Sequence, residues 1–86
     1  MKPKEFKSWR KANGFNQRVA ARKLGLKLRT VQYYEKGERK GKKIPIPKAV
    51  SLACFAISCG VTNVDFSDPR GLPKKNQNYF NLTVKN

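Results

Sequence analysis

The stretch NQRVAARKLGLKLRTVQYYEKG, residues Asn16 to Gly37, decides the fold of this chain. In its first half, small and apolar residues recur at spacings of three and four, the period of a helix with one apolar face: Ala20, Ala21 and Leu24. Its second half repeats that spacing with Val31 and Tyr34. Gly25 lies between the halves, where a residue without a Cβ can take the left-handed conformation that ends a helix. The stretch therefore predicts two short helices joined by a tight turn.

This pattern resembles the DNA-binding domain of the phage repressor and Cro type of helix-turn-helix proteins, an XRE-like family. The positions that carry the resemblance fall in one register: Gln17, Ala20, Ala21, Leu24, Gly25, Leu26, Val31, Tyr34 and Gly37. The resemblance extends from about Phe6 to Val61 and implies an all-α, compact domain of four to five helices. We therefore expect a helix-turn-helix domain over residues 1–62 and an irregular C-terminal tail over residues 63–86.

Positive charge is concentrated around the motif. The 86 residues contain 20 Lys and Arg against five Asp and Glu, a net charge of +15. Residues 1–43 carry +12 of this charge and residues 44–86 only +3. So large a positive field on a short chain favours a polyanion as the partner, because it attracts phosphate backbones over long distances. The expected partner is double-stranded DNA.

Residue types that metal sites and catalytic sites need are scarce. The chain contains no histidine, the commonest general base at neutral pH. Its two cysteines, Cys54 and Cys59, lie in an apolar run and are expected to be small core residues rather than zinc ligands or a disulfide. Five carboxylates scattered among lysines do not form a catalytic pair. We therefore expect no enzyme, no metal, no cofactor and no small-molecule ligand.

No signal peptide is recognisable at the start of the chain. The longest nearly apolar run, residues 49–61, is interrupted by Ser51, Ser58 and Gly60. It is too short to cross a bilayer whose hydrocarbon core is ~30 Å thick. These observations predict a soluble protein without a membrane partner, acting in the cytoplasm of a bacterium or of a phage-infected cell.

The first predicted helix begins near Pro3, ends at Gly14 and has one cation on its apolar side. Arg10 follows Phe6 by four residues, and a buried cation needs a partner. Members of the resembling family often join an arginine of the first helix to a glutamate near the end of the recognition helix. Arg10 and Glu35 occupy the matching positions, so the resemblance implies a structural ion pair. The alternative is that both side chains are solvated.

The second helix of the motif is expected from Leu28 to Lys36, and its outward side chains are the predicted base readers. These are Leu28, Arg29, Gln32 and Tyr33. Arg29 can donate two hydrogen bonds to guanine O6 and N7, and Gln32 can pair with adenine. Leu28 or Tyr33 would touch a thymine methyl group. The resemblance also implies base contacts at the start of this helix and, one turn later, at Tyr33.

A second group of residues is predicted to contact phosphates. Asn16 is a good N-cap for the helix that begins at Gln17, and a helix N-terminus favours an anion. Lys27 stands where the family usually has a capping Ser or Thr, so we interpret it as a residue that binds phosphate at a cost in helix stability. In the family, the loop after the recognition helix follows the DNA backbone. The full set is Asn16, Gln17, Lys27, Thr30, Lys36, Arg39, Lys40, Lys42 and Lys43.

The residues after the motif are expected to complete the core and to end in the tail. The run over residues 47–59 is apolar over a wide arc, which predicts a helix buried on two sides that packs with Phe6, Trp9 and Leu24. Its surplus apolar surface could face a second subunit. Residues 64–66 could supply one further helical turn. The segment YFNLTV, residues 79–84, alternates with period two and predicts either a β-strand that pairs with a twofold copy or a disordered tail.

The leading hypothesis is a sequence-specific DNA-binding transcriptional regulator. The resemblance favours a repressor or autoregulator of a phage or mobile element that binds an inverted repeat as a homodimer. Two alternatives belong to other classes. One is a nonspecific nucleic-acid or RNA-binding accessory protein driven by charge, and the other is an antitoxin-like protein-interaction module. An enzyme has the least support, because no nucleophile, base or metal constellation is present.

Overall fold

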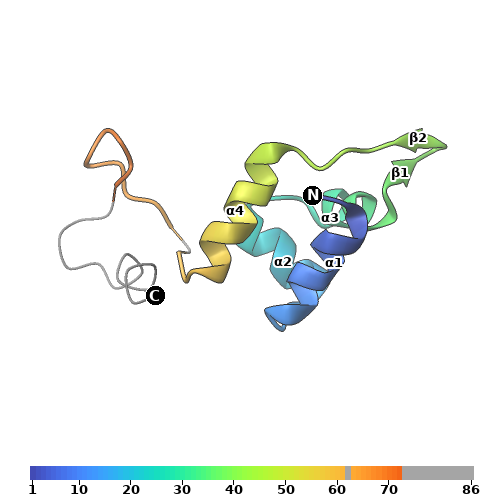
Figure 1. Ribbon diagram of the computed structural model, residues 1–86, viewed down its shortest axis with the longest axis horizontal. Coiled ribbons are helices and arrows are strands. Elements are labelled where there is room, and N and C mark those ends of the chain that lie inside the picture. The colour runs from blue at the N-terminus through green and yellow to red at the C-terminus, as the bar shows by residue number, and fades with distance from the viewer. Residues whose placement is uncertain (62, 73–86) are drawn as a thin grey trace. The chain divides into compact units, whose positions relative to one another are not determined.

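Four helices and one short hairpin make up the part of the chain described by the computed structural model, residues 1–61 and 63–72 (Figure 1). In chain order the elements are α1 (Pro3–Ala12), α2 (Gln17–Leu24), α3 (Leu28–Lys36), β1 (Glu38–Arg39), β2 (Lys42–Lys43) and α4 (Lys48–Ser58). The predicted all-α helix-turn-helix fold is confirmed. Residue contacts divide the chain into two units, Met1–Cys54 and Phe55–Asn86. The domain boundary expected near residue 62 stays a prediction.

Local residues set both ends of α2 and the C-terminal end of α3. The Asn16 side chain accepts a hydrogen bond from the backbone N–H of Val19 at 2.8 Å and so caps the start of α2. Gly25 ends α2 with φ +70°, and Gly37 ends α3 with φ +81°. Both values lie in the left-handed region that glycine tolerates best. At Gly37, moreover, a Cβ would lie 2.9 Å from Cγ of Pro3, so the start of α1 leaves no room for a side chain there.

The core joins α1, α2, α3 and the first part of α4. Its buried side chains are Phe6, Ala21, Val31, Tyr34 and Cys54, with Trp9, Leu24, Leu26, Ile44, Ile46 and Val50 packed around them. Phe6 meets the edge of Tyr34 at 5.8 Å between ring centroids. Trp9 donates its indole N–H to the carbonyl oxygen of Cys54 at 3.0 Å. The expected packing of the last helix with Phe6, Trp9 and Leu24 is therefore confirmed.

The expectation that α4 is buried on two sides is wrong. Cys54 is its buried residue, whereas Leu52 is 60% exposed and Phe55 is 66% exposed. Val50 and Cys54, four residues apart, form the single stripe through which α4 joins the core of the first unit. An apolar composition does not by itself say how many sides of a helix have neighbours.

Burial raises the pKa of the Cys54 thiol to about 11, which keeps it protonated near neutral pH.

The segment after α3, expected to be a loop, is a β-hairpin. β1 and β2 pair in antiparallel register, with Glu38 opposite Lys43 and Arg39 opposite Lys42. The turn residues Lys40 and Gly41 have φ +51° and +77°, the two positive values of a type I′ turn. The backbone N–H of Ile44 donates to the carbonyl oxygen of Gly37 at 3.0 Å, which ties the base of the hairpin to the end of α3.

Turns replace the helical turn expected at residues 64–66. Residues 63–72 contain no helix. The Asp65 carboxylate accepts from the backbone N–H of Ser67 at 2.8 Å, and that of Asp68 accepts from Arg70 at 2.9 Å. Such local hydrogen bonds compete with helix formation, which explains the difference. The strand predicted at residues 79–84 lies outside the described residues.

Candidate nucleic-acid interface

The outward face of α3 carries long polar side chains. Because Val31 and Tyr34 are buried, α3 has a defined orientation that leaves three side chains exposed: Arg29, Gln32 and Lys36. Successive helical residues are about 100° apart, so Arg29 points nearly opposite the buried side. Leu28 and Tyr33 are half-buried at the margins of this face. The four predicted base readers therefore occupy one continuous face, with Arg29 near its centre.

The start of α3 lacks a side-chain cap. Lys27 has the extended backbone of an N-cap residue, with φ −77° and ψ 148°, but its side chain accepts no hydrogen bond from the helix. Its cation is exposed beside the positive end of the α3 dipole. An anion at this end would satisfy free N–H groups and offset both positive charges. Thr30, also predicted to contact phosphates, is half-buried one turn from Lys27.

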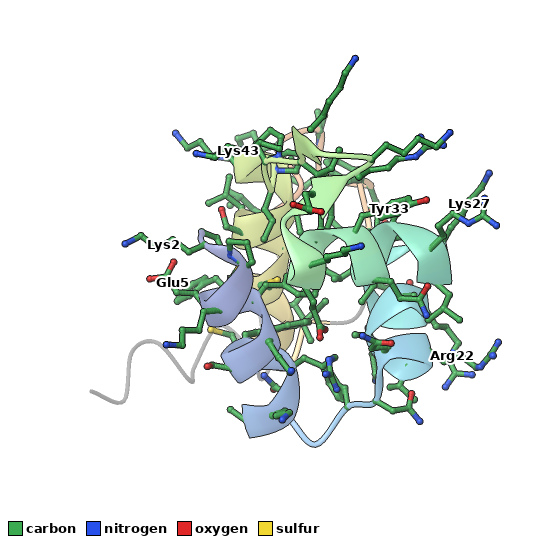
Figure 2. All side chains as sticks on the ribbon, turned by 90° about the vertical axis from the view of Figure 1, so that its right-hand side faces the viewer. Lys2, Glu5, Arg22, Lys27, Tyr33 and Lys43 are labelled. Atoms are coloured by element: carbon green, nitrogen blue, oxygen red, sulfur yellow. The ribbon has the colours of Figure 1, made fainter. Side chains whose placement is uncertain are left out.

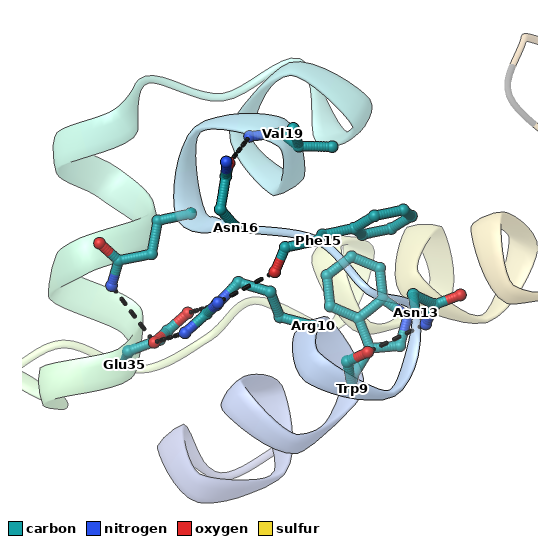
Figure 3. Close-up of polar contacts among 8 residues, drawn as sticks. Trp9, Arg10, Asn13, Phe15, Asn16, Val19 and Glu35 are labelled. Carbon is teal, nitrogen blue, oxygen red and sulfur yellow. Dashed lines mark hydrogen bonds and ion pairs between the residues drawn. The ribbon is translucent and has the colours of Figure 1, made fainter.

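A buried network ties α3 to α1 and α2 (Figure 3). Arg10 donates from Nε to Oε2 of Glu35 at 2.5 Å and from Nη2 to Oε1 at 3.0 Å. Its Nη1 donates to the carbonyl oxygen of Phe15 at 3.0 Å, and Gln17 Nε2 donates to Glu35 Oε1 at 3.3 Å. The expected partners Arg10 and Glu35 thus form a forked pair, with side chains 11% and 6% exposed.

The protonation of this network follows from its contacts. The hydrogen bond with Glu35 raises the pKa of Arg10, so the guanidinium stays charged. Burial alone would raise the pKa of Glu35, but hydrogen bonds from Arg10 and Gln17 outweigh it and lower that pKa. Both groups are therefore ionised near neutral pH, and the pair holds the C-terminal half of α3 against α1.

Asn16 and Gln17 are engaged within the fold at the start of α2. The Asn16 oxygen caps the helix, and the Gln17 amide donates to Glu35. Asn16 and Gln17 are both uncharged. The positive charge that the start of α2 offers to an anion is therefore that of its helix dipole. The Gln17 side chain therefore braces α3 through Glu35, and its predicted phosphate contact stays a prediction.

The hairpin carries four exposed cations next to the end of α3: Arg39, Lys40, Lys42 and Lys43. Because successive strand side chains point to opposite faces, Arg39 and Lys42 share one face of the ladder and Glu38 and Lys43 share the other. The Arg39 guanidinium carbon lies 5.3 Å from the centroid of the Tyr33 ring. The hairpin face that carries Arg39 and Lys42 is thereby in contact with the exposed face of α3. This hairpin face carries no acidic residue.

Arg22 is a candidate phosphate contact that the predicted set does not include. Arg22 is exposed in the last turn of α2, and Figure 2 shows it projecting from the same side of the molecule as Lys27. Lys2 and Glu5 project from the opposite side. No local signal separates Arg22 from its exposed neighbour Lys23, because tertiary packing decides which side each faces. The Lys23 cation instead lies 5.6 Å from the centroid of the Phe15 ring.

The exposed side chains of α3, with Lys27 before it and the hairpin after it, form what we call the α3–hairpin surface. It offers hydrogen-bond donors and cations, which recognise base edges and phosphates.

Within residues 1–61 and 63–72, no group of three or more His, Cys, Asp or Glu could hold a metal ion. None of the helices described has the length and apolar character that crossing a membrane requires.

Comparison with known proteins gives one match. A family model described as helix-turn-helix matches residues 6–52, which extend from α1 through the hairpin into α4. The matched residues are more than half of the chain. Comparisons with curated proteins and with solved structures found no match.

Proposed function

The chain belongs to the helix-turn-helix family of DNA-binding regulators of the repressor and Cro type, and we propose that it is a sequence-specific transcriptional repressor or autoregulator. In this proposal it binds an inverted repeat as a homodimer. The two half-sites would lie about one helical turn apart, the spacing that a twofold pair of recognition helices requires. Control of a phage or mobile element is the biological setting that the family favours.

One observation carries the proposal: Arg29 and Gln32 are exposed on the face of α3 that points away from the core. These side chains can form bidentate hydrogen bonds with guanine and adenine in the major groove. The helix that presents them is held by Val31, Tyr34 and Glu35, so the orientation of this helix is defined before DNA binds. Leu28 and Tyr33, at the margins of the same face, are proposed to contact bases beside them.

The surrounding cations are proposed to bind phosphates on both flanks of the groove. Lys27, with the N-terminus of α3, would hold one strand, and the hairpin lysines would hold the other. Asn16, Gln17, Thr30 and Lys36 complete the proposed set. We add Arg22, because it projects from the same side of the molecule as Lys27 (Figure 2). Contacts of this kind set affinity and orientation without selecting a sequence.

The proposed homodimer rests on size and symmetry. An 86-residue chain buries a small core, for which association is a natural supplement. A twofold operator also matches a twofold protein, because each copy then reads the same half-site. A DNA-binding regulator acts in the compartment that contains its DNA. The proposed location is therefore the cytoplasm of a bacterium or of a phage-infected cell.

Selection of bound fragments from a random DNA pool tests the proposal. We expect a palindromic consensus with half-site centres about 10 base pairs apart. Sedimentation of the protein with the selected duplex should give two chains for each duplex. A consensus of a single half-site, bound by one chain, would contradict the homodimer while leaving sequence-specific binding in place.

The net charge of +15 favours a second candidate, nonspecific binding of nucleic acid. Competition at one fixed salt concentration separates the two functions. A specific regulator should prefer its selected site over random duplex by at least about a thousandfold. Equal competition by random duplex or by RNA would support the charge-driven function instead.

A further inference from the structure

Arg39 differs from the other cations of the hairpin in its surroundings. Its guanidinium lies over the ring of Tyr33, 5.3 Å from the centroid, whereas no ring contact involves Lys40, Lys42 or Lys43 among the described residues. Arg39 also forms no ion pair within the described part of the chain. The Arg39 side chain is therefore supported by the Tyr33 ring. The N–H donors of Arg39 are not paired with a carboxylate in the described part of the chain.

The location of Tyr33 determines where this donor group lies. Tyr33 follows Arg29 by four residues, so the two side chains point within about 40° of one another on α3. Figure 2 shows Tyr33 extending toward the side of the molecule from which Lys27 projects. A guanidinium held on Tyr33 is consequently next to the exposed face of α3. The lysine at the tip of the hairpin, Lys40, instead extends from a two-residue turn.

We propose that Arg39, held on the Tyr33 ring, is a specificity-determining residue that reads a guanine in the major groove at a base pair next to those read from α3. This inference rests on the proposed function and changes two roles within it. Arg39 was expected to bind phosphate and becomes a base reader. Tyr33 was expected to touch a base and becomes a positioning residue.

The different chemistry of arginine and lysine supports base reading by Arg39 and phosphate binding by the hairpin lysines. A phosphate contact needs only a positive charge near the backbone, which a flexible lysine supplies. Reading guanine needs two parallel donors at fixed spacing toward O6 and N7, which a guanidinium supplies and an ammonium does not. An aromatic support restricts the rotamers of the arginine before binding, which lowers the entropy lost when it docks.

Replacing Arg39 by lysine separates base reading from charge. We would select binding sites from a random DNA pool with the wild type and with Arg39→Lys, and then measure affinities for single-base variants of the wild-type consensus. Arg39→Lys should lose the preference for one G·C pair per half-site, on the order of tenfold or more. Preferences at the other positions should remain. Because Arg39 is exposed, the thermal unfolding midpoint should not change.

Variants of Tyr33 test the positioning role. Tyr33→Leu removes the ring and should relax the same base pair as Arg39→Lys, although Arg39 is intact. Tyr33→Phe keeps the ring and should restore the preference. Lys42→Ala is the matched control, because Lys42 shares the ladder face of Arg39. It should weaken binding to all duplexes alike and leave the consensus unchanged.

The outcomes distinguish this inference from the function on which it rests. If the wild type selects a consensus and Arg39→Lys selects the same one with unchanged preferences, Arg39 is a phosphate contact and the inference is overturned. If Tyr33→Leu relaxes a different base pair, Tyr33 itself reads a base and the positioning role is overturned. If the wild type selects no consensus, the proposed function fails and the inference fails with it.

Discussion

Arg10 and Glu35 are charged side chains that the fold largely buries, and they stabilise it through geometry rather than through charge alone. The guanidinium meets the carboxylate with two hydrogen bonds and reaches the Phe15 carbonyl with a third nitrogen. Gln17 donates a further bond to the carboxylate. Removing one partner leaves the other charge buried without a partner. The resulting loss in free energy of unfolding is larger than the stabilisation that the intact pair provides.

Arg10→Ala should therefore lower the free energy of unfolding by about 3 kcal/mol. The change follows from the loss of three donors in a buried site, and urea denaturation would measure it. Arg70→Ala is the control, because Arg70 is exposed where it pairs with Asp68, and this variant should leave the midpoint unchanged. An Arg10→Ala protein that unfolds at the wild-type midpoint would show that the pair does not hold α3 in place.

The same pair predicts a dependence of stability on pH. The pKa of Glu35 in the folded protein is lowered from its ordinary value of 4.5. A carboxyl with a lowered folded pKa stabilises the fold above its unfolded pKa and loses that stabilisation as pH falls through the folded pKa. The difference in unfolding free energy between wild type and Glu35→Gln should therefore shrink below pH 4.5. A constant difference from neutral to strongly acidic pH would contradict this.

At the scale of the elements, α2 and α3 differ in how they begin. Asn16 caps α2 with its side chain, whereas Lys27 starts α3 without a side-chain hydrogen bond. The missing cap leaves N–H groups of α3 available at the edge of the α3–hairpin surface, beside an exposed cation. The fold thus gives up helix stability at a position where an anion is expected to bind.

Lys27→Ser should have opposite effects on stability and binding. A serine cap should raise the free energy of unfolding by about 1 kcal/mol, because its oxygen can accept from the first turn of α3. DNA affinity should fall, since the variant lacks a cation next to the phosphate. Asn16→Ala, which removes an existing cap, should lower stability by about 1 kcal/mol. If Lys27→Ser stabilises the protein without weakening binding, Lys27 does not contact phosphate.

The helices could be predicted from the sequence because their signals are local. Asn16, Gly25 and Gly37 mark ends, and the apolar spacing between them indicates which side faces the core. The hairpin could not be predicted, because β1 and β2 consist of charged residues that show no apolar alternation. Its one local signal is Gly41 in a turn that requires positive φ.

At the scale of the whole molecule, the distribution of charge could be predicted, but the arrangement of side chains could not. The sequence places +12 of the net charge in residues 1–43, around the motif. It does not indicate that Arg39 lies over Tyr33, that Arg22 projects with Lys27, or that Leu52 is exposed on α4. These features depend on tertiary packing, which decides the face on which each side chain lies.

The most direct test of sequence-specific reading through α3 compares Arg29→Ala with Lys42→Ala. Affinities would be measured for the selected operator, for its single-base variants and for random duplex at one salt concentration. Arg29→Ala should relax the preference at one base pair by about 1–3 kcal/mol and leave binding to random duplex almost unchanged. Lys42→Ala should weaken binding to every duplex alike. If the two variants lose affinity in the same way for all duplexes, α3 does not read the sequence.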